Sequence, residues 1–320
     1  MTTETYNRNL LNAAEKGDVA LCLKSIKKGA DVNFNIKEHG GATAATYAAW
    51  HGNVEILKIL SENNADLNHK YASGYTPVLI SVINGNLEAL KFLADCGADL
   101  NISYEGGWTA INYAAHLGSV EAVRLLVTHG ANLNIRNNNG STPATCAAWG
   151  GHEEVVKILA EHGADLNASP TNSGYTPAHN AAVLGHTNIL RHLIKHGADL
   201  NIRDNEGLTT AHRAASEGHF EALVLLAENG ADINLSNKDG KTPLYYACRE
   251  GHNEMVKYLL SKEVDFKDKK CLSLALQLYH DDVVRTLLSA GSDLNFEVIP
   301  KLFCHDFLLM IIYRKEVYHH

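Results

Sequence analysis

The stretch Gly140-Ser-Thr-Pro-Ala-Thr-Cys-Ala-Ala-Trp-Gly-Gly-His152 contains the signals that start and end a short helix. Thr142 is suited to the N-cap, and Pro143 fits the first helical position, where its missing N–H costs nothing. Gly151 can adopt the left-handed conformation that often ends a helix. The paired alanines between them would let a neighbouring helix approach closely. The stretch therefore predicts a short helix with a small apolar packing face.

The same pattern recurs along the chain at an interval of 33 or 34 residues. The threonines at the predicted N-cap are Thr43, Thr76, Thr109, Thr142, Thr176, Thr209 and Thr242. A second series, typified by Gly-Ala-Asp-Leu-Asn, runs in step with the first. Two series in phase with such a period predict a solenoid of stacked helical repeats.

A second helix is predicted between the two series. In the fifth repeat, Val155, Ile158 and Leu159 have the spacing of one apolar helix face. The glycine of the second series ends this helix, and the residues after it lead into a polar hairpin. Each repeat is therefore expected to consist of two helices and a projecting hairpin.

This pattern resembles the ankyrin repeat. The stretch quoted above and Gly240-Lys-Thr-Pro-Leu-Tyr-Tyr-Ala-Cys-Arg-Glu-Gly-His252 follow the family's Gly-x-Thr-Pro-Leu-His-x-Ala-Ala-x-x-Gly-His signature almost throughout. The resemblance extends from Arg8 to Asn295. It implies an all-α ankyrin-repeat solenoid of about nine helix-turn-helix units with projecting β-hairpin loops. It also implies protein binding, since the family mostly binds proteins.

The ends of the chain depart from the repeat. Residues 1–34 are expected to form an N-terminal capping repeat, because this segment lacks Thr-Pro. Residues 35–295 form the array of repeats two to nine. The ninth is degenerate, since Tyr279 replaces the helix-ending glycine and five residues are missing, most simply from the hairpin before it. Residues 296–320 form an apolar C-terminal capping segment or the start of a further region. A final half-repeat is favoured over a ligase-recruiting box, whose leucine and cysteine spacing the segment does not match.

Composition argues against several classes of function. Lys and Arg number 28 against 36 Asp and Glu, and the resulting net charge of −8 opposes binding to nucleic acid. The 6 cysteines are scattered and form no Cys-x-x-Cys pair, which indicates reduced thiols. The sequence shows no signal peptide and no apolar run long enough to cross a bilayer. We expect a cytoplasmic protein, or one in the host cytosol if it is a secreted effector.

The 18 histidines do not indicate a metal site. Many recur in register, before a glycine of the second series or after a helix-ending glycine, and so belong to the repeat. No His-Glu-x-x-His motif or Cys/His quartet is present. We therefore expect no metal, no cofactor, no catalytic residue and no small-molecule substrate. The histidines in register are His129, His152, His162, His186, His196, His219 and His252.

The asparagines that end the second series have two interpretations. Asn side chains in turns commonly bond to neighbouring backbone, and this structural role is favoured. The family resemblance adds a second role, as substrates of an asparaginyl hydroxylase. The candidates are Asn68, Asn101, Asn134, Asn167, Asn201 and Asn234.

The candidate partner-binding positions follow from the register. Positions +4, +7 and +8 after each threonine share one helix face. In the ankyrin family this face and position −1 line the concave surface. In repeats two to six many of these positions hold aromatic residues, including all 3 tryptophans: Tyr47, Trp50, His51, Tyr75, Trp108, Tyr113, His116, Trp149 and Tyr175. In repeats seven and eight they hold Arg213, Glu217, Lys241, Tyr246, Arg249 and Glu250.

Trp, Tyr and Arg dominate binding hot spots, so this set predicts a protein-binding face. Tyrosines at +4, such as Tyr47 and Tyr113, could instead be buried between repeats. The favoured function is a non-enzymatic interaction scaffold or adaptor that binds a protein or peptide in the concave groove. The alternative is the targeting arm of a ubiquitin-ligase adaptor or of a bacterial effector acting in a host cell, with its function in the tail or in a missing continuation.

Overall fold

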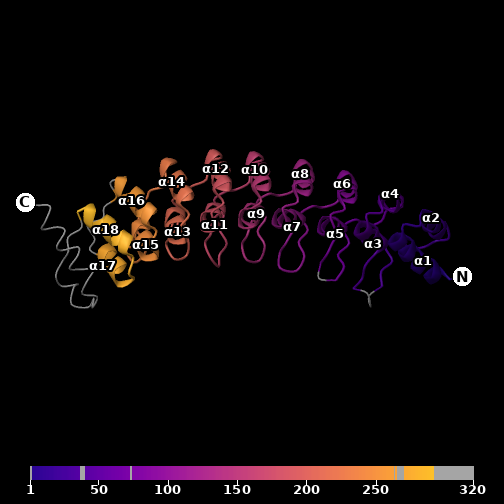
Figure 1. Cartoon of the computed structure of the whole chain (residues 1–320). Coiled ribbons are helices and arrows are strands. Elements are labelled where there is room, and N and C mark those ends of the chain that lie inside the picture. The colour runs from indigo at the N-terminus through magenta and orange to yellow at the C-terminus, as the bar shows by residue number, and fades with distance from the viewer. Residues whose placement is uncertain (1, 37–39, 73, 263, 265–269, 292–320) are drawn as a thin grey trace, which may run out of the picture. The chain divides into compact units, whose positions relative to one another are not determined.

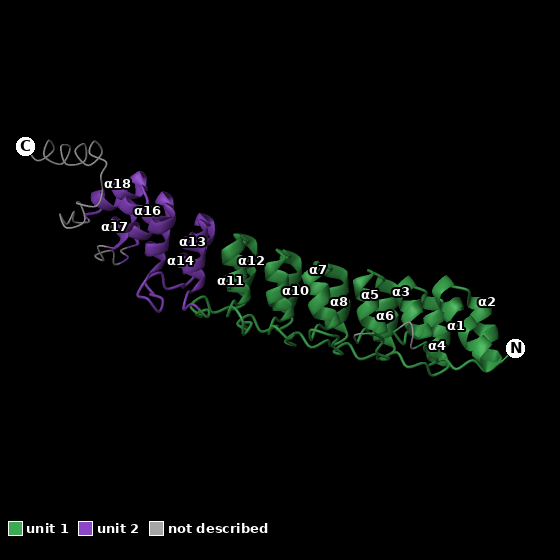
Figure 2. Ribbon diagram, turned by 90° about the horizontal axis from the view of Figure 1, so that it is seen from below, with its two compact units in different colours: residues 1–205 green, residues 206–320 purple. Residues whose placement is uncertain are grey.

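A computed structural model describes residues 2–36, 40–72, 74–262, 264 and 270–291. The chain divides into two compact units, residues 1–205 and residues 206–320 (Figure 2). The repeat period does not change at this division, since Thr176, Thr209 and Thr242 keep their spacing of 33 residues. The expected segment 296–320 lies outside the described residues.

The described residues form 18 helices, two in each repeat, which confirms the predicted all-α repeat architecture (Figure 1). The first compact unit contains α1 (Thr3–Lys16), α2 (Val19–Lys27), α3 (Ala44–His51), α4 (Val54–Glu62), α5 (Pro77–Ile83), α6 (Leu87–Asp95), α7 (Ala110–Leu117), α8 (Val120–Thr128), α9 (Pro143–Trp149), α10 (Glu153–Glu161), α11 (Pro177–Leu184) and α12 (Thr187–Lys195). The second contains α13 (Thr210–Glu217), α14 (Phe220–Glu228), α15 (Pro243–Glu250), α16 (Asn253–Ser261), α17 (Lys270–Gln277) and α18 (Asp281–Ser289).

In repeats two to eight, the first helix starts directly after the predicted threonine. Before α9, Thr142 has extended backbone, its hydroxyl accepts from the backbone N–H of Thr145, and Pro143 occupies the first turn. The backbone N–H of Thr142 in turn donates to the Thr145 hydroxyl at 2.8 Å. These reciprocal bonds satisfy donors that the start of a helix leaves free. Gly151, two residues after the end of α9, has a positive φ of 73°, as its predicted role requires.

Successive repeats stack through equivalent helices. In the first compact unit, the first helices of successive repeats pack against one another in the order α1, α3, α5, α7, α9 and α11 (Figure 1). The second helices form another row beside them, in the order α2, α4, α6, α8, α10 and α12. In the second compact unit, α13, α15 and α17 pack in the same way. The paired alanines, such as Ala147 and Ala148, are fully buried where first helices meet. Leucines and isoleucines of the second helices, such as Ile158 and Leu159, complete the core.

The described connections between repeats are tight turns with isolated β-bridges, and they do not form the regular β-hairpins that were expected. Within the described residues, β-bridges pair Ile36 with Ala42 and Tyr71 with Tyr75. A further loop is closed by the backbone hydrogen bond from the Asn137 N–H to the Ser141 carbonyl, at 3.0 Å. The predicted hairpins therefore project from the stack, but their arms are too short for a regular ladder.

The ninth repeat keeps the fold despite its degenerate sequence. Tyr279 adopts the left-handed conformation that glycine adopts elsewhere, with a φ of 59°. The connection from Ser261 to Lys270 is shorter than the equivalent one from Glu228 to Pro243, which places the missing residues before α17, as predicted.

Candidate functional site

Tyrosines from two successive loops stack in the third and fourth repeats. The rings of Tyr75 and Tyr104 are nearly parallel, with centroids 4.9 Å apart. Tyr71 lies 5.7 Å from Tyr75, and Tyr113 lies 6.1 Å from Tyr104. Tyr75 and Tyr113 are among the residues predicted from the repeat register, whereas Tyr71 and Tyr104 are not. Both missed residues occupy position −5 of their repeats, 33 residues apart, so the repeat register could have found them.

Trp108 and His116 extend this aromatic cluster along α7. The Trp108 ring meets Tyr113 and His116 edge-on, at centroid distances of 5.8 and 5.4 Å. Trp108 is consequently half-buried. Trp50 and Trp149, by contrast, are 46% and 55% exposed.

A groove of about 320 Å³ lies between the fourth, fifth and sixth repeats. Four predicted residues border it: Trp108, His116, Trp149 and Tyr175. The rest of its lining consists of amide, hydroxyl, proline and cysteine side chains, without any Asp, Glu, Lys or Arg from the described part of the chain. The groove is therefore an aromatic and polar, uncharged surface.

The groove does not present a nucleophilic cysteine. Its cysteine, Cys146, is buried on α9, and burial raises the pKa of this thiol to about 12. The thiol is therefore protonated at neutral pH, whereas nucleophilic cysteines need a lowered pKa. This surface can bind and orient a ligand.

The predicted aromatic residues of the second repeat lie outside this groove. Tyr47 is half-buried, which agrees with the alternative of packing between repeats, whereas His51 is exposed beside Trp50 on α3. The backbone carbonyl of Trp50 accepts from Asn86 Nδ2 at 2.7 Å, which anchors the end of α3 to the next repeat. Trp50 thus presents an exposed ring from a fixed backbone.

The charged residues of the second compact unit form local ion pairs. The Arg213 guanidinium lies 3.0 Å from Glu206, and the Lys241 ammonium lies 3.4 Å from Asp239. Both acidic partners are largely exposed. The Lys241 side chain is 33% exposed, so its pair contributes little to stability and this cation can change partners at small cost. The Arg213 side chain is only 12% exposed and is held more firmly in place.

Tyr246 does not present the contact surface that was expected of it. It is only 7% exposed, its hydroxyl accepts from Asn237 Nδ2 at 3.0 Å, and Arg249 covers its ring at 4.8 Å. Arg249 also pairs with Glu250 at 2.6 Å. Tyr246 packs inside the eighth repeat because a buried amide on the preceding loop supplies the donor that its hydroxyl needs.

The recurring histidines bond to backbone carbonyls. His152 Nε2 lies 2.9 Å from the His116 carbonyl of the preceding repeat, and His252 Nε2 lies 3.3 Å from that of Ser216. His162 Nδ1 instead lies 2.8 Å from the Ile158 carbonyl at the end of its own helix. These contacts support the predicted structural role. Among the residues that the structure describes, no three His, Cys, Asp or Glu side chains are grouped so as to hold a metal.

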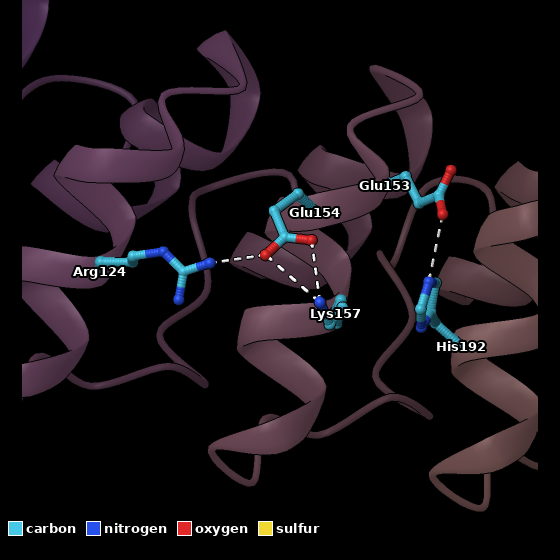
Figure 3. Close-up of polar contacts among 5 residues, drawn as sticks. All are labelled: Arg124, Glu153, Glu154, Lys157 and His192. Atoms are coloured by element: carbon cyan, nitrogen blue, oxygen red, sulfur yellow. Dashed lines mark hydrogen bonds and ion pairs between the residues drawn. The ribbon is translucent and has the colours of Figure 1, made fainter.

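Polar contacts between second helices connect the three repeats that border the groove (Figure 3). Arg124 on α8 lies 2.6 Å from Glu154 on α10, and Lys157 lies 3.2 Å from the same carboxylate. The hydrogen bond from Lys157, together with Arg124, lowers the pKa of the Glu154 carboxyl. Glu153 lies 3.2 Å from His192 on α12. These contacts help to fix the relative positions of the repeats.

The asparagines of the second series form a ladder along the first compact unit. Each side-chain oxygen accepts from a backbone N–H in the next repeat. The structural role is thereby confirmed for four candidates, which pair as Asn68 with Asp99, Asn101 with Asn132, Asn134 with Asp165, and Asn167 with Asp199, at 2.7 to 2.9 Å.

Comparison with known protein families identifies the repeats independently. A model of ankyrin repeats in three copies matches residues 10–104 and 102–170. A model of ankyrin repeats in many copies matches residues 178–227 and 211–260. Together they cover well over half of the chain, although neither reaches the ninth repeat. No curated protein matches the chain significantly. None of the helices in the described ranges has the length and apolar character needed to span a membrane.

Proposed function

The chain belongs to the ankyrin-repeat family, and from this premise we propose that it is a non-enzymatic scaffold or adaptor that binds a partner protein or peptide. Ankyrin repeats are generally protein-interaction modules, and proteins built from them are typically binding scaffolds. The contact surface is formed by the first helices and the loops that project beside them.

The groove between repeats four and six carries this proposal. Its aromatic border combines large apolar rings with polar edges, which is the composition of binding hot spots. Trp149, on that border, is a large apolar residue that is 55% exposed. A partner that covers this side chain would remove apolar surface from water, which favours association.

The remaining predicted residues serve as secondary contacts. Trp50 and His51 offer an exposed aromatic patch on the second repeat, and Arg213, Lys241 and Arg249 offer positive charge on repeats seven and eight. Charges at the edge of an interface set the association rate and its salt dependence more than the affinity. We assign Tyr246 to packing, because its ring is buried.

We place the protein in the cytosol. The cysteines within the described residues are free, as reduced thiols in that compartment would be. The finer alternative, a ubiquitin-ligase adaptor or a bacterial effector in a host cell, depends on the tail or on a missing continuation. We rank it second, because the leucine and cysteine spacing of the tail does not match a ligase-recruiting box.

Purification of the full chain from its native cell tests both the scaffold function and the ligase-adaptor alternative. A scaffold should retain a partner that mass spectrometry identifies, and a ligase adaptor should also retain ligase subunits. Trp50→Ala, Trp108→Ala and Trp149→Ala should each reduce partner binding, by roughly 2 kcal/mol or more. Leu23→Ala, which removes an exposed side chain from α2, is the control. Parental binding by all three tryptophan variants would show that the assigned surface is wrong.

A further inference from the structure

The groove lies where the fifth repeat lacks a tyrosine. Position +4 holds Tyr47, Tyr113 and Tyr246 in the second, fourth and eighth repeats, but Cys146 in the fifth. Cys146 is much smaller, and it lines the groove. The space that a tyrosine ring fills in the eighth repeat is therefore open in the fifth.

The eighth repeat shows how such a tyrosine is held. Asn237, at position −5, uses its Oδ1 to accept from the backbone N–H groups of Asp239 and Lys241, both at 2.9 Å. Its Nδ2 donates to the Tyr246 hydroxyl at 3.0 Å. The side-chain amide of Asn237 therefore has hydrogen-bond partners at both its oxygen and its nitrogen, and the Tyr246 hydroxyl is the partner of the nitrogen.

The fifth repeat contains the same amide without its tyrosine. Asn137, also at position −5, accepts at Oδ1 from the backbone N–H groups of Asn139 and Ser141, at 3.0 and 2.9 Å. Asn137 is only 5% exposed and lines the groove. No group in the described part of the chain accepts a hydrogen bond from its Nδ2. Because this donor opens onto the groove and has no partner within the described chain, it is free to bond to an acceptor supplied from outside.

A second buried amide faces the same groove. Asn180, at position +4 of the sixth repeat, is 6% exposed and lines the groove from α11. Its Nδ2 donates to the Thr145 carbonyl at 3.2 Å, and its Oδ1 receives no hydrogen bond from the described residues. The groove therefore offers one donor and one acceptor beside the rings of Trp108 and Trp149.

We propose that this groove receives a tyrosine side chain of the partner protein. The ring packs above Cys146 against Trp108 and Trp149, and the phenolic oxygen accepts from Asn137 Nδ2, as the Tyr246 oxygen accepts from Asn237. A donor on the same partner segment binds Asn180 Oδ1. The inference rests on the proposed interaction function and names the chemistry of the partner.

The uncharged lining distinguishes tyrosine from its closest analogues. A phenylalanine fills the same space but leaves Asn137 Nδ2 without an acceptor. A phosphotyrosine would place two negative charges where no Lys or Arg of the described chain lines the groove. The expected order of affinity is therefore tyrosine, then phenylalanine, then phosphotyrosine.

Titration of the full chain with N-acetyl-tyrosinamide tests the proposal, with the indole N–H signals of the three tryptophans as readout. The signals of Trp108 and Trp149 should shift and saturate, whereas that of Trp50, outside the groove, should not. N-acetyl-phenylalaninamide should bind about tenfold more weakly, the expected effect of one hydrogen bond to a buried amide. The phosphotyrosine amide should cause no saturable shift.

Two variants test the position of the site. Cys146→Tyr should fill the groove with the chain's own ring and abolish the shifts of Trp108 and Trp149, while helicity and melting temperature are retained. Cys146→Ser, which leaves the groove open, should bind like the parent. The proposal is overturned if a folded Cys146→Tyr binds like the parent, or if the parent binds the tyrosine and phenylalanine probes equally.

The outcome also separates this inference from the proposed function. If the parent shows no shift with the tyrosine probe while Trp149→Ala still weakens the native partner, the tyrosine assignment is wrong and the scaffold function stands. If Trp149→Ala, Trp108→Ala and Trp50→Ala also leave partner binding unchanged, the proposed interaction surface fails as well.

Discussion

The side-chain oxygen of Asn134 accepts a hydrogen bond from the backbone N–H of Asp165, 2.7 Å away in the next repeat. The backbone N–H of Asn134 is itself bonded to Asn132 Oδ1 at 3.0 Å. Each loop therefore orders its own turn and then satisfies a donor in the loop that follows. Because backbone donors in turns lack helical partners, this ladder fixes the loops that border the groove.

Replacing Asn134 with alanine should lower the free energy of unfolding by about 1 kcal/mol, because one hydrogen bond is lost and the Asp165 N–H is left to water. Urea denaturation of the full chain measures the change. Asn172→Ala removes an exposed amide that makes no hydrogen bond in the described structure and is the control. An equal effect of both substitutions would mean that the ladder contributes nothing specific.

The same ladder bears on hydroxylation of these asparagines. In the folded array Asn68, Asn101, Asn134 and Asn167 are held by bonds to the neighbouring loop, so we expect little reaction with an asparaginyl hydroxylase. Co-expression with such an enzyme, followed by intact-mass measurement, should show no gain of oxygen atoms. Stoichiometric gain in a fully folded chain would instead establish these residues as substrates.

His129 should stabilise the chain in a pH-dependent way. Its Nε2 lies 2.9 Å from Asp95 Oδ1 and its Nδ1 lies 2.8 Å from the Leu125 carbonyl, so both ring nitrogens face acceptors. The hydrogen bond to Asp95, then that to Leu125, raises the pKa of His129. A raised folded-state pKa gives stabilisation that is complete below the unfolded pKa of about 6.5 and is lost as pH rises through the folded value.

The pH dependence of His129 can be isolated by mutation. An NMR titration should show the pKa of His129 falling in Asp95→Asn, and the corresponding loss of unfolding free energy at rising pH should become smaller, since the bond to the Leu125 carbonyl remains. His162→Gln is the control, because His162 occupies the same register and bonds to the Ile158 carbonyl. It should leave the titration of His129 unchanged. An unaltered His129 pKa in Asp95→Asn would contradict the assignment.

Tyr279 offers a stabilising substitution. It is 76% exposed and has a φ of 59°, a conformation that costs residues other than glycine about 1–2 kcal/mol. Tyr279→Gly should raise the free energy of unfolding by about 1 kcal/mol, after the extra chain entropy of glycine is subtracted. The reverse change, Gly251→Ala, should destabilise the eighth repeat, because a Cβ there would lie 2.7 Å from His280 Nδ1. Thermal unfolding should therefore show a higher melting temperature for Tyr279→Gly and a lower one for Gly251→Ala.

The repeat register predicted the helices because their start and end signals are local. Thr142 and Gly151 act within one repeat, and the structure confirms both. The groove depends on side chains from three repeats, and this relation is not local. Cys146 looks like an ordinary core residue, and only its position beside Asn137 and Asn180 shows that it leaves space. The burial of Tyr246 depends on a contact within one repeat, with the amide of Asn237, which the helix start and end signals do not encode.

Trp108 and Trp149 should separate stability from binding. Trp149 is 55% exposed, so Trp149→Ala should leave the free energy of unfolding nearly unchanged and weaken partner binding by roughly 2 kcal/mol. Trp108 contacts Tyr113 and His116 edge-on, so Trp108→Ala should also cost about 1 kcal/mol of stability. Calorimetric titration with the co-purified partner and urea denaturation measure the two quantities. If Trp149→Ala destabilises the chain as much as Trp108→Ala does, the exposed ring has a packing role, and its place at the centre of the interaction surface is refuted.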